Sequence, residues 1–239
     1  MGSIGNTSSA PLDFTSLSNQ EAMNKISQLQ QEMGQTGYEA GNPDTNPSSK
    51  LYVNSGKSWC INQYLNSDGK TYKSDMTDWD KYIDKQWVKN AINQIDKGMK
   101  PLSQDLKTYR YMTADALGKT LNIKVNDGNF DSFIQQLESN ANGHYKEGLG
   151  TAFKDLLKNI NYTHKAYTST TYKPEHGSYD THAVKMEIVA KKGTNAIVTA
   201  NHKEHEILLG RNAKYKFTGK YKVESSKGGK KQLVLYVEI

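Results

Sequence analysis

Three stretches of the chain, far apart in the sequence, carry side chains that could act together on a ribose and its phosphates. Arg110 lies in a strand-like stretch, Ser169 begins a Ser-Thr-Thr run, and Glu204 and Glu206 are separated by one residue. A planar guanidinium suits a pyrophosphate. A carboxylate can stabilise the oxocarbenium-like cation that forms when a glycosidic bond breaks. These stretches would supply a phosphate anchor, an orienting hydroxyl and a carboxylate beside the sugar.

The two glutamates are the strongest chemical signal of the three stretches. Residues two apart in a strand project from the same face, so we expect Glu204 and Glu206 to share one site while His205 points away. Each stretch alone also has an ordinary explanation, since solvated acids, surface arginines and threonine-rich strands are common. Their order favours function, because the apolar run Ile207-Leu208-Leu209 follows the second glutamate directly.

In this order the chain resembles the Arg-Ser-Glu class of mono-ADP-ribosyltransferases, which includes binary-toxin enzymatic components, Rho-modifying exoenzymes and phage-encoded relatives. The resemblance covers roughly residues 51–239. Four stretches carry it: residues 100–103 leading to Tyr109-Arg110, residues 167–171, residues 192–196 and residues 204–211.

The chain departs from the family pattern at a few positions. Gly210 and Asn212 stand where the family usually has proline and glycine, and Thr171 ends the serine motif in place of serine. Residues 199–203, which precede the glutamates, hold no aromatic side chain, although family members often carry one there. Target recognition would then use His202, Lys203 or other surfaces.

The resemblance implies an enzyme that cleaves NAD at its nicotinamide–ribose bond. Arg110 would bind the NAD phosphates, and Ser169 would hold Glu206 against the nicotinamide ribose. Glu206 would stabilise the developing cation, and Glu204 would orient or deprotonate the acceptor.

Further residues complete the NAD site that we expect. Tyr111 and Thr170 flank the matching arginine and serine, and Tyr172 or Tyr179 could stack on nicotinamide. NAD would be a substrate held outside a Rossmann fold, because no Gly-rich dinucleotide motif is present. We expect no metal, since His202 and His205 have no evident third ligand.

The Glu-x-Glu spacing implies transfer of ADP-ribose to a host protein, with arginine as the favoured acceptor. A nucleic acid or free base as acceptor, simple NAD hydrolysis, and a catalytically silent adaptor with the same fold remain open alternatives. The resemblance implies a secreted or injected bacterial toxin, or a protein that a phage delivers into the host cytoplasm.

Composition limits the remaining possibilities. The net charge is +6 and the isoelectric point is near 9.1, which is compatible with anionic ligands but equally with ordinary lysine-rich solubility. No apolar run approaches the ~18 residues of a membrane span, and the start resembles no signal peptide. Because Cys60 is the single cysteine, an internal disulfide is excluded, and we expect Cys60 to be buried as a small apolar residue.

The chain divides into two parts by composition. Residues 1–50 are rich in small polar residues, which predicts a flexible N-terminal segment. It would contain one amphipathic helix, whose apolar face carries Met23, Ile26, Leu29 and Met33. Residues 51–239 would form the catalytic domain.

Periodic apolar residues predict the elements of that domain. One helix begins near Thr77 as N-cap and ends at Gly98, and another spans residues 149–160. A strand covers residues 106–112, and several short strands follow residue 167. Helices first and strands later indicate an α+β fold with antiparallel sheets. The resemblance implies that these strands form two packed, mostly antiparallel sheets, together with an N-terminal helical part.

Overall fold

The chain's strands pair in a single order, β1-β6-β7-β4-β2-β5-β9-β8-β3, in a computed structural model that describes residues 10–35, 57–72, 83–139, 149–174, 181–199, 205–226 and 228–239. Within those ranges the strands are β1 Lys100–Pro101, β2 Leu106–Met112, β3 Tyr162–His164, β4 Thr168–Thr171, β5 Val184–Ala190, β6 Asn195–Val198, β7 Glu206–Leu209, β8 Ala213–Ser225 and β9 Lys231–Glu238. Every neighbouring pair is antiparallel except β5 and β9, which run parallel. The predicted α+β class with mostly antiparallel strands is confirmed.

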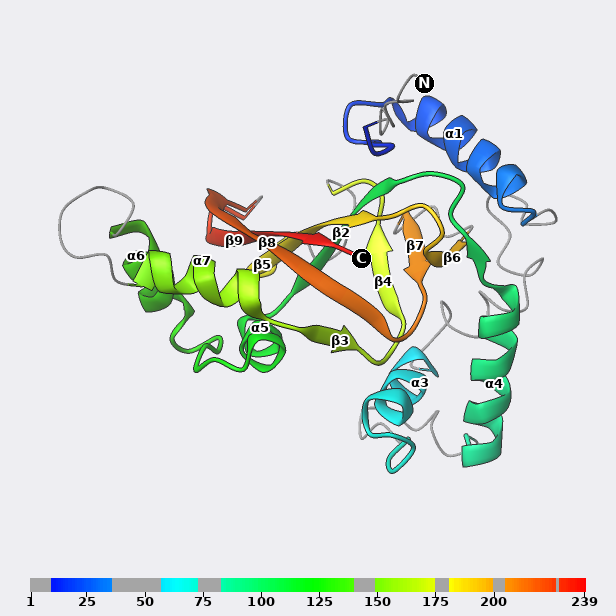
Figure 1. Cartoon of the computed structure of the whole chain (residues 1–239), viewed down its shortest axis with the longest axis horizontal. Helices are drawn as coiled ribbons and strands as arrows, with labels where there is room; N and C mark the ends of the chain where they lie inside the picture. The colour runs from blue at the N-terminus through cyan, green and yellow to red at the C-terminus, as the bar shows by residue number, and fades with distance from the viewer. Residues whose placement is uncertain are drawn as a thin grey trace, which may run out of the picture.

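The two halves of this strand order meet at a narrow junction. Strands β2 and β4 pair through Tyr109 and Thr171 alone, whereas β2 and β5 pair over seven residues. In the view of Figure 1, β4 and β7 run vertically, whereas β9 runs nearly horizontally. The predicted two sheets are therefore the two sides of this junction, β1-β6-β7-β4 and β2-β5-β9-β8-β3, joined in one order.

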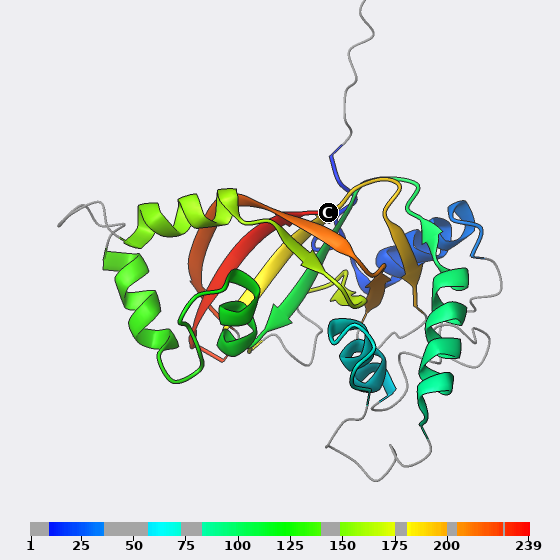
Figure 2. The same cartoon turned by 60° about the horizontal axis from the view of Figure 1, so that its bottom comes forward.

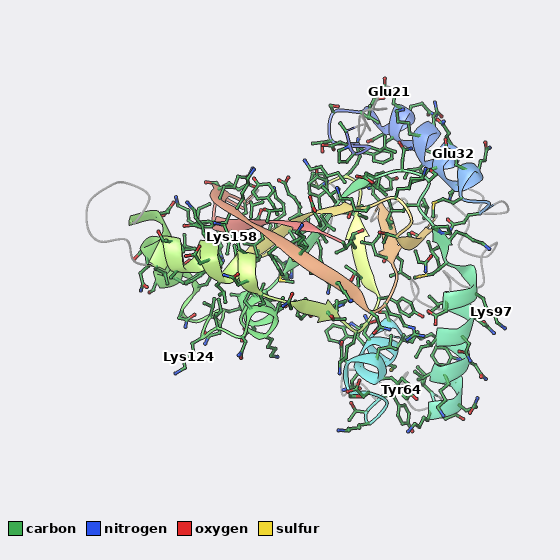
Figure 3. The ribbon with its side chains drawn as sticks, in the orientation of Figure 1. Glu21, Glu32, Tyr64, Lys97, Lys124 and Lys158 are labelled. Atoms are coloured by element: carbon green, nitrogen blue, oxygen red, sulfur yellow. The ribbon has the colours of Figure 1, made fainter. Side chains whose placement is uncertain are left out.

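Helices cover the two halves separately. The described helices are α1 Asn19–Glu32, α3 Lys57–Asn66, α4 Lys85–Gly98, α5 Ala114–Leu121, α6 Phe130–Ser139 and α7 Leu149–Asn159. Figures 1 and 2 both place α5, α6 and α7 at one end of the molecule, and α3 and α4 at the other. Polar side chains such as Glu21 on α1 and Lys97 on α4 point outward (Figure 3).

The half that holds β7 and β4 is buried on both of its faces. All four residues of β7 are buried. Ile207 and Leu209 join the large core with α1, while Leu208 joins a second core formed with α3 and α4. Because strand residues alternate between faces, Glu206 projects to the same side as Leu208. The side chain of Glu206 therefore lies on the face that α3 and α4 cover.

Helix α1 packs on the opposite face of this half. Its predicted apolar positions Ile26 and Leu29 are buried in the large core, and Met33 just beyond it is buried too, whereas Met23 is exposed. Ser18 and Glu21 form a capping box at its start. The predicted boundary near residue 50 falls in residues 36–56, outside the described part of the chain, and stays a prediction.

Several helix predictions need correction. Helix α4 begins at Lys85 with Asp84 as its N-cap, so the predicted cap at Thr77 is wrong; Thr77 itself lies outside the described residues. Helix α7 ends at Asn159, one residue before the predicted end. Helices α5 and α6 were not predicted, although Thr113 caps α5 through its hydroxyl. Cys60 is buried, as expected.

Candidate active site

Ser169 and Glu206 meet on neighbouring strands. Strands β4 and β7 pair so that Ser169 lies opposite Leu208 and Thr171 lies opposite Glu206. The Ser169 hydroxyl donates to Glu206 Oε1 at 2.6 Å, and Glu206 is only 3% exposed. Hydrogen bonds to a carboxylate at this length are among the strong ones in proteins. The two residues that the sequence paired are therefore in direct contact.

The main chain around Glu206 is held from both sides. Thr199, which follows β6, donates to the Glu206 carbonyl through its amide at 3.3 Å and its hydroxyl at 3.1 Å. On the other side, the Tyr172 amide donates to the His205 carbonyl at 3.0 Å. The backbone at the start of β7 is thus fixed between the ends of β6 and β4.

His205 does not continue the strand. It has a φ of 50°, in the left-handed region, and β7 begins only at Glu206. The expected strand through residues 204–206 is therefore wrong at His205. Strand alternation cannot place Glu204 relative to Glu206, and Glu204 lies outside the described residues. The His205 ring packs edge-on against Tyr172, with ring centroids 5.0 Å apart.

Arg110 occupies the middle of β2, as predicted, and is half-buried. Its guanidinium lies close to the Tyr215 hydroxyl and to the His164 ring, and it affects the pKa of both groups. Tyr215 Oη in turn lies 2.7 Å from Thr168 Oγ1, at the start of β4. The residue after Thr168 is Ser169. Tyr215 therefore bonds to the strand that carries Ser169, and the charge of Arg110 acts on its hydroxyl.

His164 is uncharged at neutral pH. Burial, followed by the nearby positive charge of Arg110, lowers the pKa of the imidazole to about 4. The Tyr162 hydroxyl lies 3.0 Å from its Nδ1. The positive charge of this cluster is consequently carried by Arg110.

The other expected NAD residues differ in what surrounds them. The Tyr111 hydroxyl donates to the Pro174 carbonyl at 2.7 Å. Thr170 is buried, and its hydroxyl donates to the Ile207 carbonyl at 2.8 Å, so that hydroxyl is engaged with the main chain. Tyr179 lies outside the described residues.

Tyr167, Asp96 and Arg211 form a hydrogen-bonded group next to the start of β4. The buried Tyr167, two residues before Ser169, donates its hydroxyl to Asp96 Oδ1 at 2.6 Å. Arg211 binds the same carboxylate with two nitrogens, at distances of 2.9 to 3.2 Å. Asp96 belongs to α4 and Arg211 follows β7, so this group joins the helix to both strands of the site.

Sequence reasoning missed Tyr215, His164 and Thr168. A weak signal existed in the alternation of Tyr162 with His164 and of Tyr215 with Phe217, which places aromatic rings on one face of each strand. Strands β3 and β8 pair with Tyr162 opposite Tyr215. That pairing, which local sequence does not specify, brings these rings together.

The described residues contain no group of three or more His, Cys, Asp or Glu side chains that could hold a metal ion. Nor is any helix among them long and apolar enough to span a membrane.

The fold and the family match define a class of enzyme, the NAD-dependent ADP-ribosyltransferases. A model of the ADP-ribosyltransferase exoenzyme family matches residues 16–238, and the chain belongs to that family. NAD is the substrate of its reaction. A search of curated protein sequences found no match.

Solved structures agree with this assignment at the level of the fold. Plx2a, an ADP-ribosyltransferase toxin from Paenibacillus larvae, has a TM-score of 0.60 at 18% identity, covering 95% of this chain and 98% of Plx2a. C3stau2 from S. aureus, solved with NAD, has a TM-score of 0.60 at 18% identity, covering 96% and 98%.

The ADP-ribosylating toxin BECa of a C. perfringens binary enterotoxin, solved with NADH, is similar over part of its length. It has a TM-score of 0.61 at 18% identity. The match covers 95% of this chain but only 49% of BECa.

Proposed function

We propose that this ADP-ribosyltransferase transfers ADP-ribose from NAD to an arginine side chain of a protein, with Glu206 as the central catalytic residue. The observation that carries the proposal is the hydrogen bond from Ser169 to the buried carboxylate of Glu206. The arginine acceptor rests on the second acid, Glu204, two residues earlier in the sequence.

The breaking bond is the one between the nicotinamide nitrogen and C1′ of the ribose. Its electron pair leaves with nicotinamide, which departs neutral, and positive charge develops on the ribose ring. Glu206, held by the Ser169 hydroxyl, would lie against the ribose and stabilise that charge. A carboxylate held in advance loses no free energy to reorganisation as the charge forms.

The phosphates need a cation that stays charged. Arg110 fits this requirement, because a guanidinium keeps its proton and can bind phosphate oxygens with two nitrogens. His164 beside it is neutral, so the charge that binds the phosphates would be that of Arg110. Tyr111, Thr170 and Tyr179 complete the proposed NAD set, with Thr170 acting through the strand it bonds to.

The acceptor step requires a base. An arginine guanidinium is a poor nucleophile until a proton is drawn from it. In the proposed step an acceptor nitrogen attacks C1′, the new C–N bond forms, and Glu204 takes the proton. Water in place of the guanidinium would give free ADP-ribose instead.

Labelled NAD tests the proposal directly. The protein is incubated with labelled NAD and a host lysate, beside Glu206→Ala and Glu204→Ala variants. We expect Glu206→Ala to abolish both nicotinamide release and labelling of protein, and Glu204→Ala to lose labelling while retaining some NAD hydrolysis. Stability of the label to neutral hydroxylamine assigns the linkage, since linkages to arginine are cleaved more readily than linkages to cysteine or asparagine.

The same experiment separates the alternatives. A label that resists protease but yields to nuclease would indicate a nucleic-acid acceptor. Nicotinamide release without any labelled macromolecule would indicate a hydrolase. If the wild-type protein neither binds NAD nor releases nicotinamide, the proposed enzymatic activity is refuted.

A further inference from the structure

The chain before α1 lies along one edge of β2. Leu12 pairs with β2 as a parallel strand would: its amide donates to the Asp105 carbonyl, and its carbonyl accepts from the Lys107 amide, both at 2.9 Å. Strand β5 occupies the other edge of β2, and β4 pairs with β2 only between Tyr109 and Thr171. Leu12 therefore extends the edge of β2 that β4 pairs with at a single position.

Side chains strengthen this attachment to β2. Thr15 Oγ1 lies 2.7 Å from the Tyr109 hydroxyl. Lys107 Nζ lies 3.3 Å from Asp13 Oδ2. Tyr109 is the residue that pairs with β4, and Arg110 follows it directly. The chain before α1 is thus fixed to β2 next to the proposed phosphate anchor.

The same stretch of chain also binds the residues that follow β4. Lys173 is 7% exposed, and its ammonium donates to the Leu17 carbonyl at 2.8 Å and to Asn19 Oδ1 at 2.9 Å. A buried charge requires such partners, because its transfer from water is costly. Phe14 is fully buried, and its ring centroid lies 5.0 Å from that of Tyr172. Tyr172 and Lys173 directly follow β4, so they attach it to the chain before α1.

Tyr172 extends this attachment to the strand that carries the carboxylate. It is 2% exposed, its ring packs edge-on against the His205 ring, and its amide donates to the His205 carbonyl at 3.0 Å. His205 directly precedes Glu206. Phe14 therefore supports, through one ring, the residue next to Glu206. With both neighbours in place, Tyr172 has almost no exposed surface for stacking on nicotinamide.

We propose that residues 12–19 form a clasp that sets the distance between Arg110 and the Ser169–Glu206 pair, so that one NAD molecule can contact both. Lys173 is the positioning residue through which the clasp holds β4. The inference rests on the proposed function, since it assumes that Arg110 binds the phosphates. The narrow junction explains the need for a clasp, because a single residue pair between β2 and β4 holds the two sheet halves together only weakly.

A ligand that reaches only one side of the junction separates alignment from folding. NAD would span from Arg110 to Glu206, whereas ADP carries the phosphates without the nicotinamide ribose. Loss of alignment should weaken binding of NAD and spare binding of ADP, because only a ligand with two attachment points depends on their separation. The test therefore measures the NAD dissociation constant and the inhibition constant of ADP in nicotinamide release.

Two variants loosen the clasp. Lys173→Met keeps the length of the side chain and removes both hydrogen bonds to the clasp. We expect it to raise the NAD dissociation constant about tenfold and the ADP inhibition constant less than about twofold. Thr15→Val removes the bond to Tyr109 from an exposed residue, so it keeps the fold even if Lys173→Met loses it. We expect it to raise the NAD dissociation constant about threefold, again with little change for ADP.

Lys185→Met is the matched control. Lys185 is a half-buried lysine whose ion pair with Glu224 joins β5 to β8 within one sheet half. It should bind NAD and ADP as the wild type does, at a temperature where urea unfolding shows all the variants to be folded.

Three results would overturn this inference and leave the proposed function standing. They are an unchanged NAD dissociation constant in both clasp variants, an equal weakening of NAD and ADP, and a loss in Lys185→Met as large as that in Lys173→Met. Failure of ADP to inhibit the wild type would overturn the phosphate anchor on which the clasp depends. Failure of the wild type to bind NAD would overturn both the clasp and the proposed function.

Discussion

Ser169 and Glu206 are diagonal neighbours across two antiparallel strands. Ser169 lies opposite Leu208, and its hydroxyl reaches past that position to Glu206 at 2.6 Å. The contact therefore depends on the register of β4 and β7. A slip of one residue would turn the Glu206 carboxylate to the opposite face, toward the core that contains Ile207. The placement of the carboxylate follows from the pairing of two four-residue strands.

Removing the Ser169 hydroxyl should slow the chemical step. In Ser169→Ala the buried carboxylate loses a hydrogen-bond donor worth about 1.5–3 kcal/mol, so we expect kcat for nicotinamide release to fall about 10–100-fold. KM for NAD should change little, because Arg110, the proposed phosphate anchor, is unchanged in this variant. Steady-state nicotinamide release measures both constants. Thr163→Ala, which removes an exposed hydroxyl on β3, serves as the control; full activity in Ser169→Ala would contradict the role given to the serine.

Local sequence patterns predicted β2 and α7 almost to the residue, because the apolar spacing of each is regular. The Ser169–Glu206 contact was expected from the family resemblance, since nothing local specifies which strands pair. Tyr215 was missed because it contacts Thr168 across 47 residues of sequence. Such contacts arise only when β3, β8 and β4 have assembled.

Two further differences have physical causes in the chain. Thr77 and Asp84 are both suitable N-cap residues, and apolar residues at helical spacing follow each of them, so sequence alone does not choose between them. At His205 the strand pattern was interrupted by a residue with positive φ. Histidine is only moderately enriched in that conformation, and its identity gave no warning.

The hydroxyl of Tyr167 should matter more for stability than the guanidinium of Arg211. Both bind Asp96, but Tyr167 is buried and Arg211 is exposed. We expect Tyr167→Phe to lower the free energy of unfolding by about 1–2 kcal/mol. Arg211→Lys loses the two-nitrogen geometry at a solvent-screened site, so its cost should stay at or below about 1 kcal/mol. Urea unfolding compares the two variants, and the reverse order would contradict the importance of burial here.

His164 should make the fold sensitive to mild acid. Its folded pKa of about 4 lies below the ordinary value of 6.5, so between these values only the unfolded imidazole binds a proton. The contribution of His164 to stability is therefore complete above pH 6.5 and falls as the pH drops towards 4, by up to about 3 kcal/mol. The groups facing it are the Arg110 guanidinium, the Tyr162 hydroxyl, the Tyr215 ring and the Tyr167 main chain.

A neutral replacement isolates that effect. His164→Gln cannot titrate, so its free energy of unfolding should fall less steeply than that of the wild type between pH 6.5 and 4.5. The carboxylates with lowered pKa values, such as Asp105 and Glu224, lose their contributions at lower pH and add little to the difference. Parallel curves for the two proteins in this window would show that His164 does not titrate as described.

Gln35, which follows α1, should stabilise the β1-β6-β7-β4 half of the sheet. Its side chain bonds to the main chain of β6, as a neighbouring strand would. Gln35 donates to the Ala196 carbonyl at 2.9 Å and accepts from the Val198 amide at 3.2 Å. It thereby covers the edge of β6 beyond the point where pairing with β1 ends at Ala196. Gln35→Leu would leave both buried main-chain groups without this partner, so we expect a loss of about 2–4 kcal/mol. Hydrogen exchange at the Val198 amide should accelerate accordingly.

Two further variants test whether the hydrogen bonds from Gln35 to β6 account for this stabilisation. Gln28→Leu, on the exposed side of α1, removes an amide that bonds to Glu32 in the same helix, so it should cost no more than about 0.5 kcal/mol. Gln35→Glu can donate to the Ala196 carbonyl only when protonated, and burial raises the pKa of such a carboxyl. Its deficit relative to wild type should therefore shrink as the pH falls and grow as the pH rises. A deficit that does not depend on pH would mean that Gln35 acts by filling space, and not by completing the hydrogen bonds of β6.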